Sequence, residues 1–255
     1  MSFKMVATDM DWTLLDAERR IPPEVFKLFN KITLSGGYVA IVTGRDVESA
    51  REVFLENAYE PGRDGYPHAF AAANKIFYLE GTEYVPDEEW NAKIEKWWSE
   101  SQPLAKQIID EIIPQLEGYK YERTWDCGLG FTNLEDAIQA QKIITQYMRE
   151  NGISSILLER NGWGIALNDV RLGKGNCLYR ITQKMGLRPE EVIAIGDSNN
   201  DRTMLDGKIG FFPACPANAD GEIIDLVREK SGLIAKKNYG WGVVEVIKQA
   251  FWSKT

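Results

Sequence analysis

Three continuous runs of apolar residues in the first third of the chain are separated by segments of mixed polarity. The runs end near Thr8, Val42 and Ala73. Continuous apolar runs are typical of parallel strands that are buried on both faces of a sheet. Residues 22–35 and 47–57, between the runs, are predicted to be helices, the first because its apolar side chains recur at helical spacing. This β-α-β-α-β order predicts a Rossmann-like α/β fold with a doubly wound, mostly parallel sheet.

The pattern changes after residue 75. Residues 76–85 alternate like a hairpin, and a long helical segment rich in tryptophan begins near Pro86. A strand-like stretch over 119–132, an amphipathic helix over 134–150 and a hairpin over 153–168 follow. Mixed strands and helices of this kind predict an α+β cap domain over residues 86–168, inserted into the first domain.

The doubly wound pattern resumes at Lys174, which opens a predicted helix. Further strands are expected at 192–195, 209–212 and 233–235, with helices at 218–228 and 242–251. Residues 1–85 and 169–255 therefore form one discontinuous core domain in this prediction.

Composition narrows the choice of partners and compartment. A net charge of -8 and a pI near 5.0 argue against nucleic acid or an anionic membrane as the main partner. No apolar run approaches the roughly 20 residues that a membrane span requires, and no signal peptide is recognisable, so we expect a cytoplasmic protein. The three cysteines are widely spaced and the chain has one histidine, which disfavours a disulfide framework, a zinc site or a histidine-led mechanism.

Four groups of polar residues stand where the chemistry of an α/β protein is usually found. Three of them follow predicted strands, whose carboxyl ends meet at one edge of the sheet, and the fourth opens a helix. Because strand side chains have a period of two, the first two aspartates should project to the same side. The groups are Asp9 and Asp11; Thr43, Gly44 and Arg45; Lys174; and Asp197, Asn200 and Asp201.

These residue types suit phosphoryl transfer. Asp9 can attack phosphorus to form an aspartyl-phosphate, and Asp11 can protonate the leaving alcohol and then deprotonate the hydrolytic water. Carboxylates at Asp9 and Asp197, with a backbone carbonyl and waters, can hold a hard divalent ion such as Mg²⁺.

Four donors in the same groups are matched to the oxygens of a phosphoryl group. They are the Thr43 hydroxyl, the Gly44 amide, the Asn200 side-chain amide and the Lys174 ammonium. Positioning and charge stabilisation by such donors account for most of the catalysis of phosphoryl transfer.

The chain resembles the haloacid dehalogenase superfamily of phosphatases, and within it the Cof-like members with a type II (B) cap. The motifs that carry the resemblance are D-M-D-W-T-L-L-D, T-G-R, L-G-K-G and A-I-G-D-S-N-N-D, which begin at residues 9, 43, 172 and 194. The resemblance implies a nucleophilic Asp9 and an acid/base Asp11. It also implies Mg²⁺ bound by Asp9, Asp197 and the Asp11 carbonyl, with Asp201 behind these ligands or at a metal-bound water.

Trp12 departs from the family pattern, because Cof-like relatives usually carry glycine there. Its indole either narrows the site or packs beneath the cap, or else it packs against the adjacent turn. Asn74 falls where relatives have an Asn-Gly segment near the substrate, with Lys75 in place of the glycine.

The cap and the edge of the core supply candidate substrate residues. Trp90, Trp97 and Trp98 fall at helical spacing, so most of them are expected to pack in the cap core. The candidates for substrate contact are Arg45, Asn74, Arg123, Trp125 and Trp163.

The expected function is a Mg²⁺-dependent phosphatase for a small phosphorylated metabolite, a sugar phosphate, similar to sucrose-phosphatase and mannosyl-3-phosphoglycerate phosphatase. Two alternatives stay open at this point: a phosphomannomutase-like phosphotransferase, and a binding protein that retains the fold without turnover. The expected assembly is a monomer or a homodimer, with no nucleic acid or membrane partner.

Overall fold

The computed structural model describes residues 3–252, which form two compact units. The α/β unit contains the described parts of Met1–Asn91, Lys174–Asp197 and Asp201–Thr255. The inserted unit contains Ala92–Gly173 together with Ser198–Asn200. The boundaries at residues 86 and 168 expected from the sequence stay a prediction.

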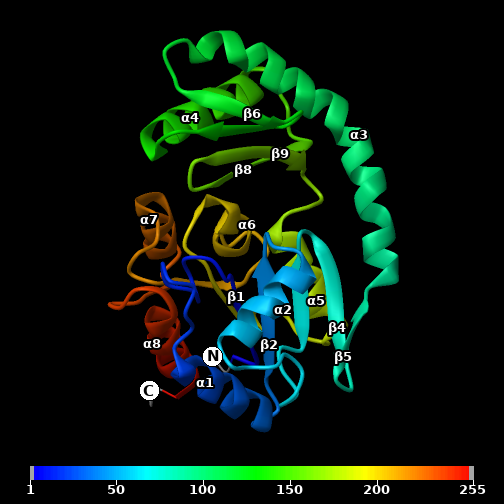
Figure 1. Ribbon diagram of the computed structural model, residues 1–255, viewed down its shortest axis with the longest axis vertical. Coiled ribbons are helices and arrows are strands. Elements are labelled where there is room, and N and C mark those ends of the chain that lie inside the picture. The colour runs from blue at the N-terminus through cyan, green and yellow to red at the C-terminus, as the bar shows by residue number, and fades with distance from the viewer. Residues whose placement is uncertain (1–2, 253–255) are drawn as a thin grey trace. The chain divides into compact units, whose positions relative to one another are not determined.

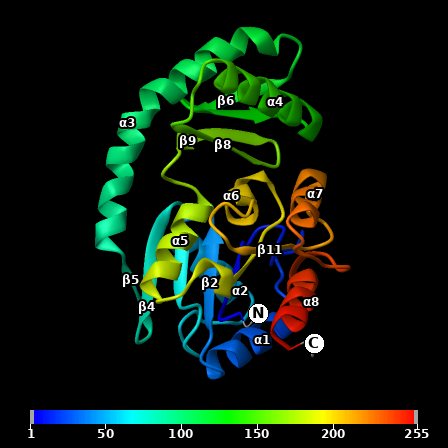
Figure 2. The same cartoon turned by 180° about the vertical axis from the view of Figure 1, so that it is seen from behind.

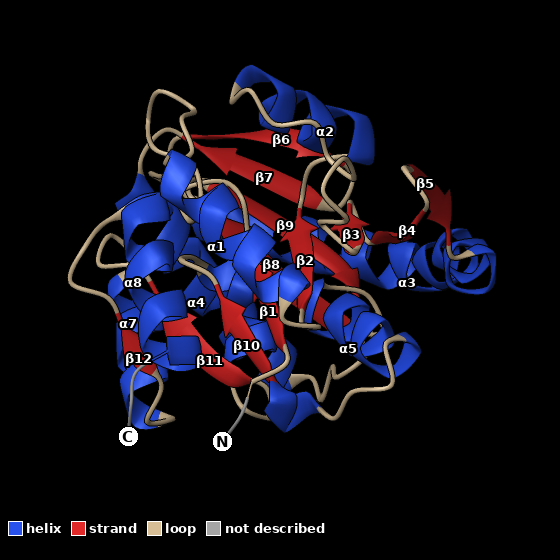
Figure 3. Cartoon of the chain, turned by 90° about the horizontal axis from the view of Figure 1, so that it is seen from below, coloured by secondary structure: helices blue, strands red, loops and turns tan. Residues whose placement is uncertain are grey.

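An eight-stranded sheet organises the α/β unit, with the strand order β12-β11-β10-β1-β2-β3-β4-β5. Every pairing from β12 to β3 is parallel, and β4 and β5 are added antiparallel at one edge. Figure 3 shows β11, β10, β1 and β2 as neighbouring strands. The strands are β1 Met5–Thr8, β2 Tyr38–Thr43, β3 Ala69–Ala72, β4 Lys75–Glu80, β5 Glu83–Pro86, β10 Val192–Ile195, β11 Phe212–Cys215 and β12 Leu233–Ile234.

Helices cover both faces of this sheet (Figures 1 and 2). Val6 and Ile41 point into a core with α1, α2 and α8, whereas Ala7 and Val42 point into a second core with α5, α6 and α7. This alternation explains why the strands read as continuous apolar runs. The helices are α1 Pro23–Leu34, α2 Val47–Glu56, α5 Lys174–Lys184, α6 Arg202–Leu205, α7 Gly221–Glu229 and α8 Tyr239–Trp252, with 3₁₀ turns η2 Pro189–Glu191 and η3 Asn199–Asp201.

The inserted unit is a four-stranded antiparallel sheet with two helices. Its strand order is β6-β7-β9-β8, and residues of β9 alternate between buried and half-buried, as expected when one face of a sheet is covered. Ile108 of α3 and Ile144 of α4 belong to the core on that face. The elements are α3 Glu88–Ile112, η1 Ile113–Leu116, β6 Tyr121–Trp125, β7 Gly128–Phe131, α4 Leu134–Glu150, β8 Ile156–Asn161 and β9 Gly164–Asp169.

The predicted α/β fold is confirmed, but the strand predicted at residues 209–212 is wrong. The strand is β11, which begins at Phe212, because Gly210 has a positive φ of 104° and the chain turns there. Pro213 is tolerated in the strand because β12 begins opposite Ala214, so no β12 residue pairs with the proline.

Two further details differ from the sequence prediction. The strand-like stretch at 119–132 is two strands, β6 and β7, and helix α7 begins at Gly221 instead of residue 218. Trp97 and Trp98 are only half-buried, because the buried residues of α3 lie from Ser101 onward. The expectation that these tryptophans form a core was therefore wrong. Within the described residues, no helix has both the length and the apolar composition for crossing a membrane.

Candidate active site

Asp9 lies at the carboxyl end of β1, the strand between β10 and β2. Its backbone N–H donates to the Ile195 carbonyl at 2.9 Å, which continues the parallel ladder past the end of the strand. The side chain is buried, with an exposed fraction of 4% for the residue. A carboxylate is thus presented at the centre of the sheet edge, where α/β proteins bind their ligands.

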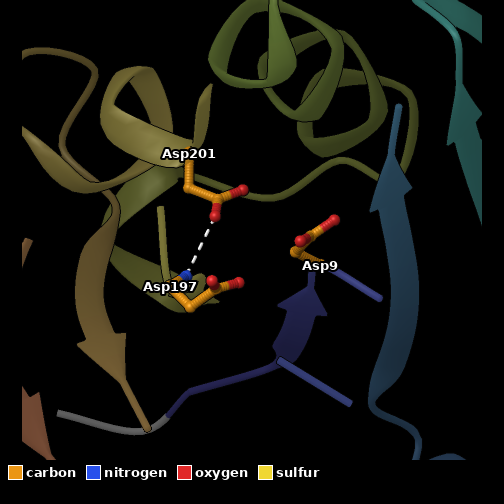
Figure 4. A group of neighbouring side chains, drawn as sticks. All are labelled: Asp9, Asp197 and Asp201. Carbon is orange, nitrogen blue, oxygen red and sulfur yellow. Dashed lines mark hydrogen bonds between the residues drawn. The ribbon is translucent and has the colours of Figure 1, made fainter. Parts of the chain in front are cut away.

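Asp197 and Asp201 come from the segment that follows β10. The Asp197 backbone N–H donates to Asp201 Oδ2 at 2.9 Å, and the Thr13 hydroxyl donates to Asp197 Oδ1 at 2.6 Å. A Cβ on Gly196 would collide with the Asp201 carboxyl, so this tight turn requires glycine. Figure 4 shows the three carboxylates of Asp9, Asp197 and Asp201 converging from these two segments.

Lys174, the first residue of α5, is the cation that contacts this group. Its Nζ lies 2.7 Å from Asp9 Oδ1 and 2.6 Å from Asp201 Oδ1, and both side chains are buried. A Cβ on Gly175 would collide with the Thr203 carbonyl, so the glycine lets α5 approach α6 closely. In the motif, Lys174 is therefore required for its charge and Gly175 for its lack of a side chain.

Negative charge exceeds positive charge in this buried acidic cluster, by which we mean Asp9, Asp197 and Asp201. Carboxylate oxygens of the three lie within 4.8 Å of one another, and Lys174 contacts only two of them. Burial raises the pKa of Asp9 to about 7 and that of Asp197 to about 9 despite the ammonium group. The Asp201 and Asp9 carboxylates raise the pKa of Lys174 above its ordinary value against the opposing effect of burial, so the lysine stays charged. Oxygen ligands with a deficit of positive charge fit a hard divalent cation such as Mg²⁺.

Asp11 has a different environment from Asp9. The Arg45 guanidinium donates to both of its oxygens, from Nε at 2.8 Å and from Nη2 at 2.6 Å. The backbone N–H of Arg45 lies 3.2 Å from the Thr43 hydroxyl, within the turn that ends β2. The guanidinium of Arg45 thus has the acid/base candidate as its partner, and the expected contact of Arg45 with substrate stays a prediction. Gly44 is exposed in this turn, with free space around its Cα.

Of the residues expected to contact phosphate, Thr43 and Lys174 lie in the α/β unit, whereas Asn200 groups with the inserted unit. The Asn200 Oδ1 accepts a hydrogen bond from the Ser198 hydroxyl at 2.6 Å. Its contact with a phosphoryl group stays a prediction, as do those of Thr43, Gly44 and Lys174.

Asn74 has a left-handed backbone, with φ 66°, in the turn between β3 and β4. Its carbonyl accepts from Trp90 Nε1 at 2.9 Å. This contact ties the turn to the start of α3, and a substrate role for Asn74 stays a prediction.

The cap candidates lie in the inserted unit. Arg123 is paired with Asp110 at 2.7 Å and donates to the Asp126 carbonyl, while Trp125 stacks on Trp98 with ring centroids 5.8 Å apart. Trp163 lies in the turn between β8 and β9 and is well exposed. Substrate contact by Arg123, Trp125 and Trp163 stays a prediction.

Thr13 is the residue whose role the sequence interpretation missed. Its hydroxyl donates to Asp197 from a position 184 residues away in the chain. The signal was present, because Thr13 belongs to the motif that begins at Asp9, but only the fold reveals its partner.

Known proteins that are similar to this chain include several phosphatases. A 5-amino-6-(5-phospho-D-ribitylamino)uracil phosphatase of Bacillus subtilis is 26% identical over 97% of this chain and 96% of that protein. A phosphoglycolate phosphatase of Thermoplasma volcanium is 25% identical over 95% of this chain and 96% of that protein. The sucrose-phosphatase of Synechocystis, solved with sucrose and phosphate, has a TM-score of 0.71 at 19% identity and covers 98% of both chains.

The predicted resemblance to haloacid dehalogenase phosphatases is confirmed at the level of the family, and with it the class of phosphoric monoester hydrolases. The model of the sucrose-6F-phosphate phosphohydrolases matches residues 3–249, which is nearly the whole chain. The chain therefore belongs to the sucrose-6F-phosphate phosphohydrolase family.

Proposed function

We propose that this protein is a Mg²⁺-dependent phosphatase that hydrolyses a small phosphorylated metabolite, a sugar phosphate, through an aspartyl-phosphate. The observation that carries the proposal is the buried acidic cluster at the end of β1 and β10, with Lys174 as its only close cation among the described ion pairs. Such a site favours binding of a divalent cation, and that cation together with Lys174 would offset the negative charge of a transferring phosphoryl group.

In the first step Asp9 attacks the phosphorus atom, and the alkoxide of the metabolite leaves. Asp11 donates a proton to that oxygen as the bond breaks. Lys174, Thr43, Gly44 and Asn200 hold the phosphoryl oxygens during the transfer. When bound by Asp9, Asp197 and the Asp11 carbonyl, with Asp201 supporting them, Mg²⁺ offsets negative charge on the phosphoryl group.

In the second step Asp11, now ionised, takes a proton from the water that attacks the aspartyl-phosphate, and Asp9 and inorganic phosphate are released. The pairing of Asp11 with Arg45 supports the base role in this step, because the guanidinium orients the ionised carboxylate while leaving it partly exposed. For the acid role in the first step, Arg45 must release one of the two oxygens. A carboxylate that must exchange a proton twice in each turnover requires such access.

The named relatives divide the substrate choice into two chemical groups. Sucrose phosphate and the ribitylaminouracil phosphate, which are implied by the names of two of them, have large leaving groups, whereas phosphoglycolate is small and acyclic. The family membership supports a sugar phosphate, and the enzyme would act as a monomer or a homodimer.

The decisive experiment measures inorganic phosphate release from sucrose 6F-phosphate, glucose 6-phosphate, phosphoglycolate and p-nitrophenyl phosphate, after treatment with EDTA and again with added Mg²⁺. We expect release only with Mg²⁺ and the highest kcat/KM with a sugar phosphate. Phosphate transfer between hydroxyl groups without net release would favour the phosphotransferase alternative. Binding of these esters without turnover would favour the non-catalytic alternative.

A further inference from the structure

Trp12, the residue after Asp11, has a backbone conformation that large side chains rarely adopt. Its φ is 60°, in the left-handed region, where the Cβ of an L-residue crowds the neighbouring carbonyl. Glycine would adopt this conformation without that cost. The chain thus retains an indole at a position where its backbone favours glycine.

One side chain holds this strained backbone in place. The Asn218 amide donates from Nδ2 to the Trp12 carbonyl at 2.7 Å, and its Oδ1 accepts from the Tyr239 backbone N–H at 2.6 Å. Tyr239 is left-handed as well, with φ 50°. Asn218 therefore fixes two aromatic residues in uncommon conformations at the same time, and such strain tends to occur at functional positions.

The position of Trp12 does not serve core packing. Its ring meets the Tyr239 ring at a centroid distance of 5.9 Å, yet the residue is 51% exposed. Trp12, Asn218 and Tyr239 follow β1, β11 and β12 respectively, all parallel strands, so they lie at the same sheet edge as Asp9. The free face of the indole is thus presented at the edge that carries the proposed chemistry.

We propose that the exposed face of Trp12 binds the leaving group of the substrate, and that this leaving group contains a ring with a flat apolar face. A sugar ring and a heteroaromatic base share this chemistry, and both pack well on an indole. The inference rests on the proposed phosphatase function, in which Asp11 protonates the departing oxygen. Trp12 follows Asp11 in the chain and lies at the same sheet edge, so the proposal places the departing group against the exposed face of its indole. A small acyclic group has no ring to cover it.

The test measures binding in the Asp9→Asn variant with Mg²⁺, so that the ligands are not consumed. Dissociation constants are determined by calorimetry for glucose 6-phosphate, uridine 5′-monophosphate and phosphoglycolate, with and without Trp12→Gly. We expect Trp12→Gly to weaken one or both ring ligands about 3- to 10-fold more than phosphoglycolate. The ring ligand with the larger loss identifies a sugar or a base as the partner of the indole.

Two further variants separate binding from folding. Trp12→Phe should retain most of the preference for the ring ligand, and Trp241→Ala, which removes another half-exposed indole, should leave all three constants unchanged. Thermal unfolding should show Trp12→Gly to be at least as stable as its parent, because glycine relieves the left-handed strain. An equal loss for all three ligands, or no loss for any, would overturn the proposal. These dissociation constants do not depend on turnover. An inactive wild-type protein would therefore count against the phosphatase function and not against binding of a ring by Trp12.

Discussion

The buried acidic cluster and the Asp11–Arg45 pair balance their negative charge in opposite ways, although Asp9 and Asp11 are only two residues apart. In the cluster, three carboxylates share one ammonium group, and burial raises the pKa of Asp9 and Asp197. In the pair, one partly exposed carboxylate has a guanidinium of its own. The first region has an excess of negative charge that a bound cation or protons would offset, and the second does not. Asp9 and Asp11 are the same residue type, so the difference between them comes from the residues that surround each side chain in the fold.

The largest expected effect follows from Asp9→Asn, which removes the nucleophile from the cluster. The amide has the same shape but cannot attack phosphorus, so kcat should fall about 10⁴-fold or more. Phosphate release with Mg²⁺ measures it. Asp225→Asn, at an exposed aspartate paired with Arg228, is the matched control and should retain full activity. Substantial turnover by Asp9→Asn would remove the aspartyl-phosphate from the mechanism.

Asp11→Asn tests the other side of the comparison. Loss of the proton carrier should lower kcat by about 10²- to 10⁴-fold. The Mg²⁺ concentration for half-maximal activity should stay unchanged, because the carbonyl of Asp11 and not its carboxylate is the proposed ligand. If this Mg²⁺ concentration rose as much as it does in Asp197→Asn, the Asp11 carboxylate would be part of the metal site and the two regions would not be distinct.

Asp197→Asn should weaken Mg²⁺ binding without affecting proton transfer by Asp11. We expect the half-activating Mg²⁺ concentration to rise by about tenfold or more. In EDTA the variant should unfold at a temperature no lower than wild type, because the neutral amide replaces a carboxyl group whose ionised form is disfavoured by burial and by the neighbouring carboxylates. Thermal unfolding with and without Mg²⁺ measures this. Mg²⁺ at about 100 times its Kd stabilises wild type by about 2.7 kcal/mol, and a tenfold weaker site would keep only about 1.4 kcal/mol at the same concentration. A clear destabilisation in EDTA would mean that the cluster is balanced without a cation.

Arg45→Ala should give the smallest effect and sharpens the role of the guanidinium. The free energy of unfolding should fall by no more than about 1 kcal/mol, because the pair is partly exposed. Turnover should fall less than in Asp11→Asn, and Arg45→Lys should not restore it, since an ammonium cannot span both carboxylate oxygens. Kinetics and urea unfolding measure both. A rise in KM with unchanged kcat would instead return Arg45 to the substrate, as the sequence interpretation had it.

The accuracy of the sequence prediction depended on how local the physical signal was. Strands β1, β2 and β10 and helix α4 were predicted well, because burial on both faces and helical spacing are written in consecutive residues. Strand β11 was misplaced, because a proline is acceptable there only when the neighbouring strand has not yet begun. The burial of Trp97 and Trp98 was misjudged for a similar reason. Helical spacing shows that the two side chains share an apolar face of the helix, but not which residues cover that face.

By itself, the sequence determined the doubly wound order of elements, the polar residues at strand ends and the family motifs. Those features depend on neighbours in the chain. The fold decided which charges meet: that Lys174 lies between Asp9 and Asp201, that Thr13 donates to Asp197, and that Arg45 holds Asp11. These partners come from segments far apart in the sequence. Electrostatic interactions at 3 Å and burial therefore arise only when the parallel strands bring their ends together.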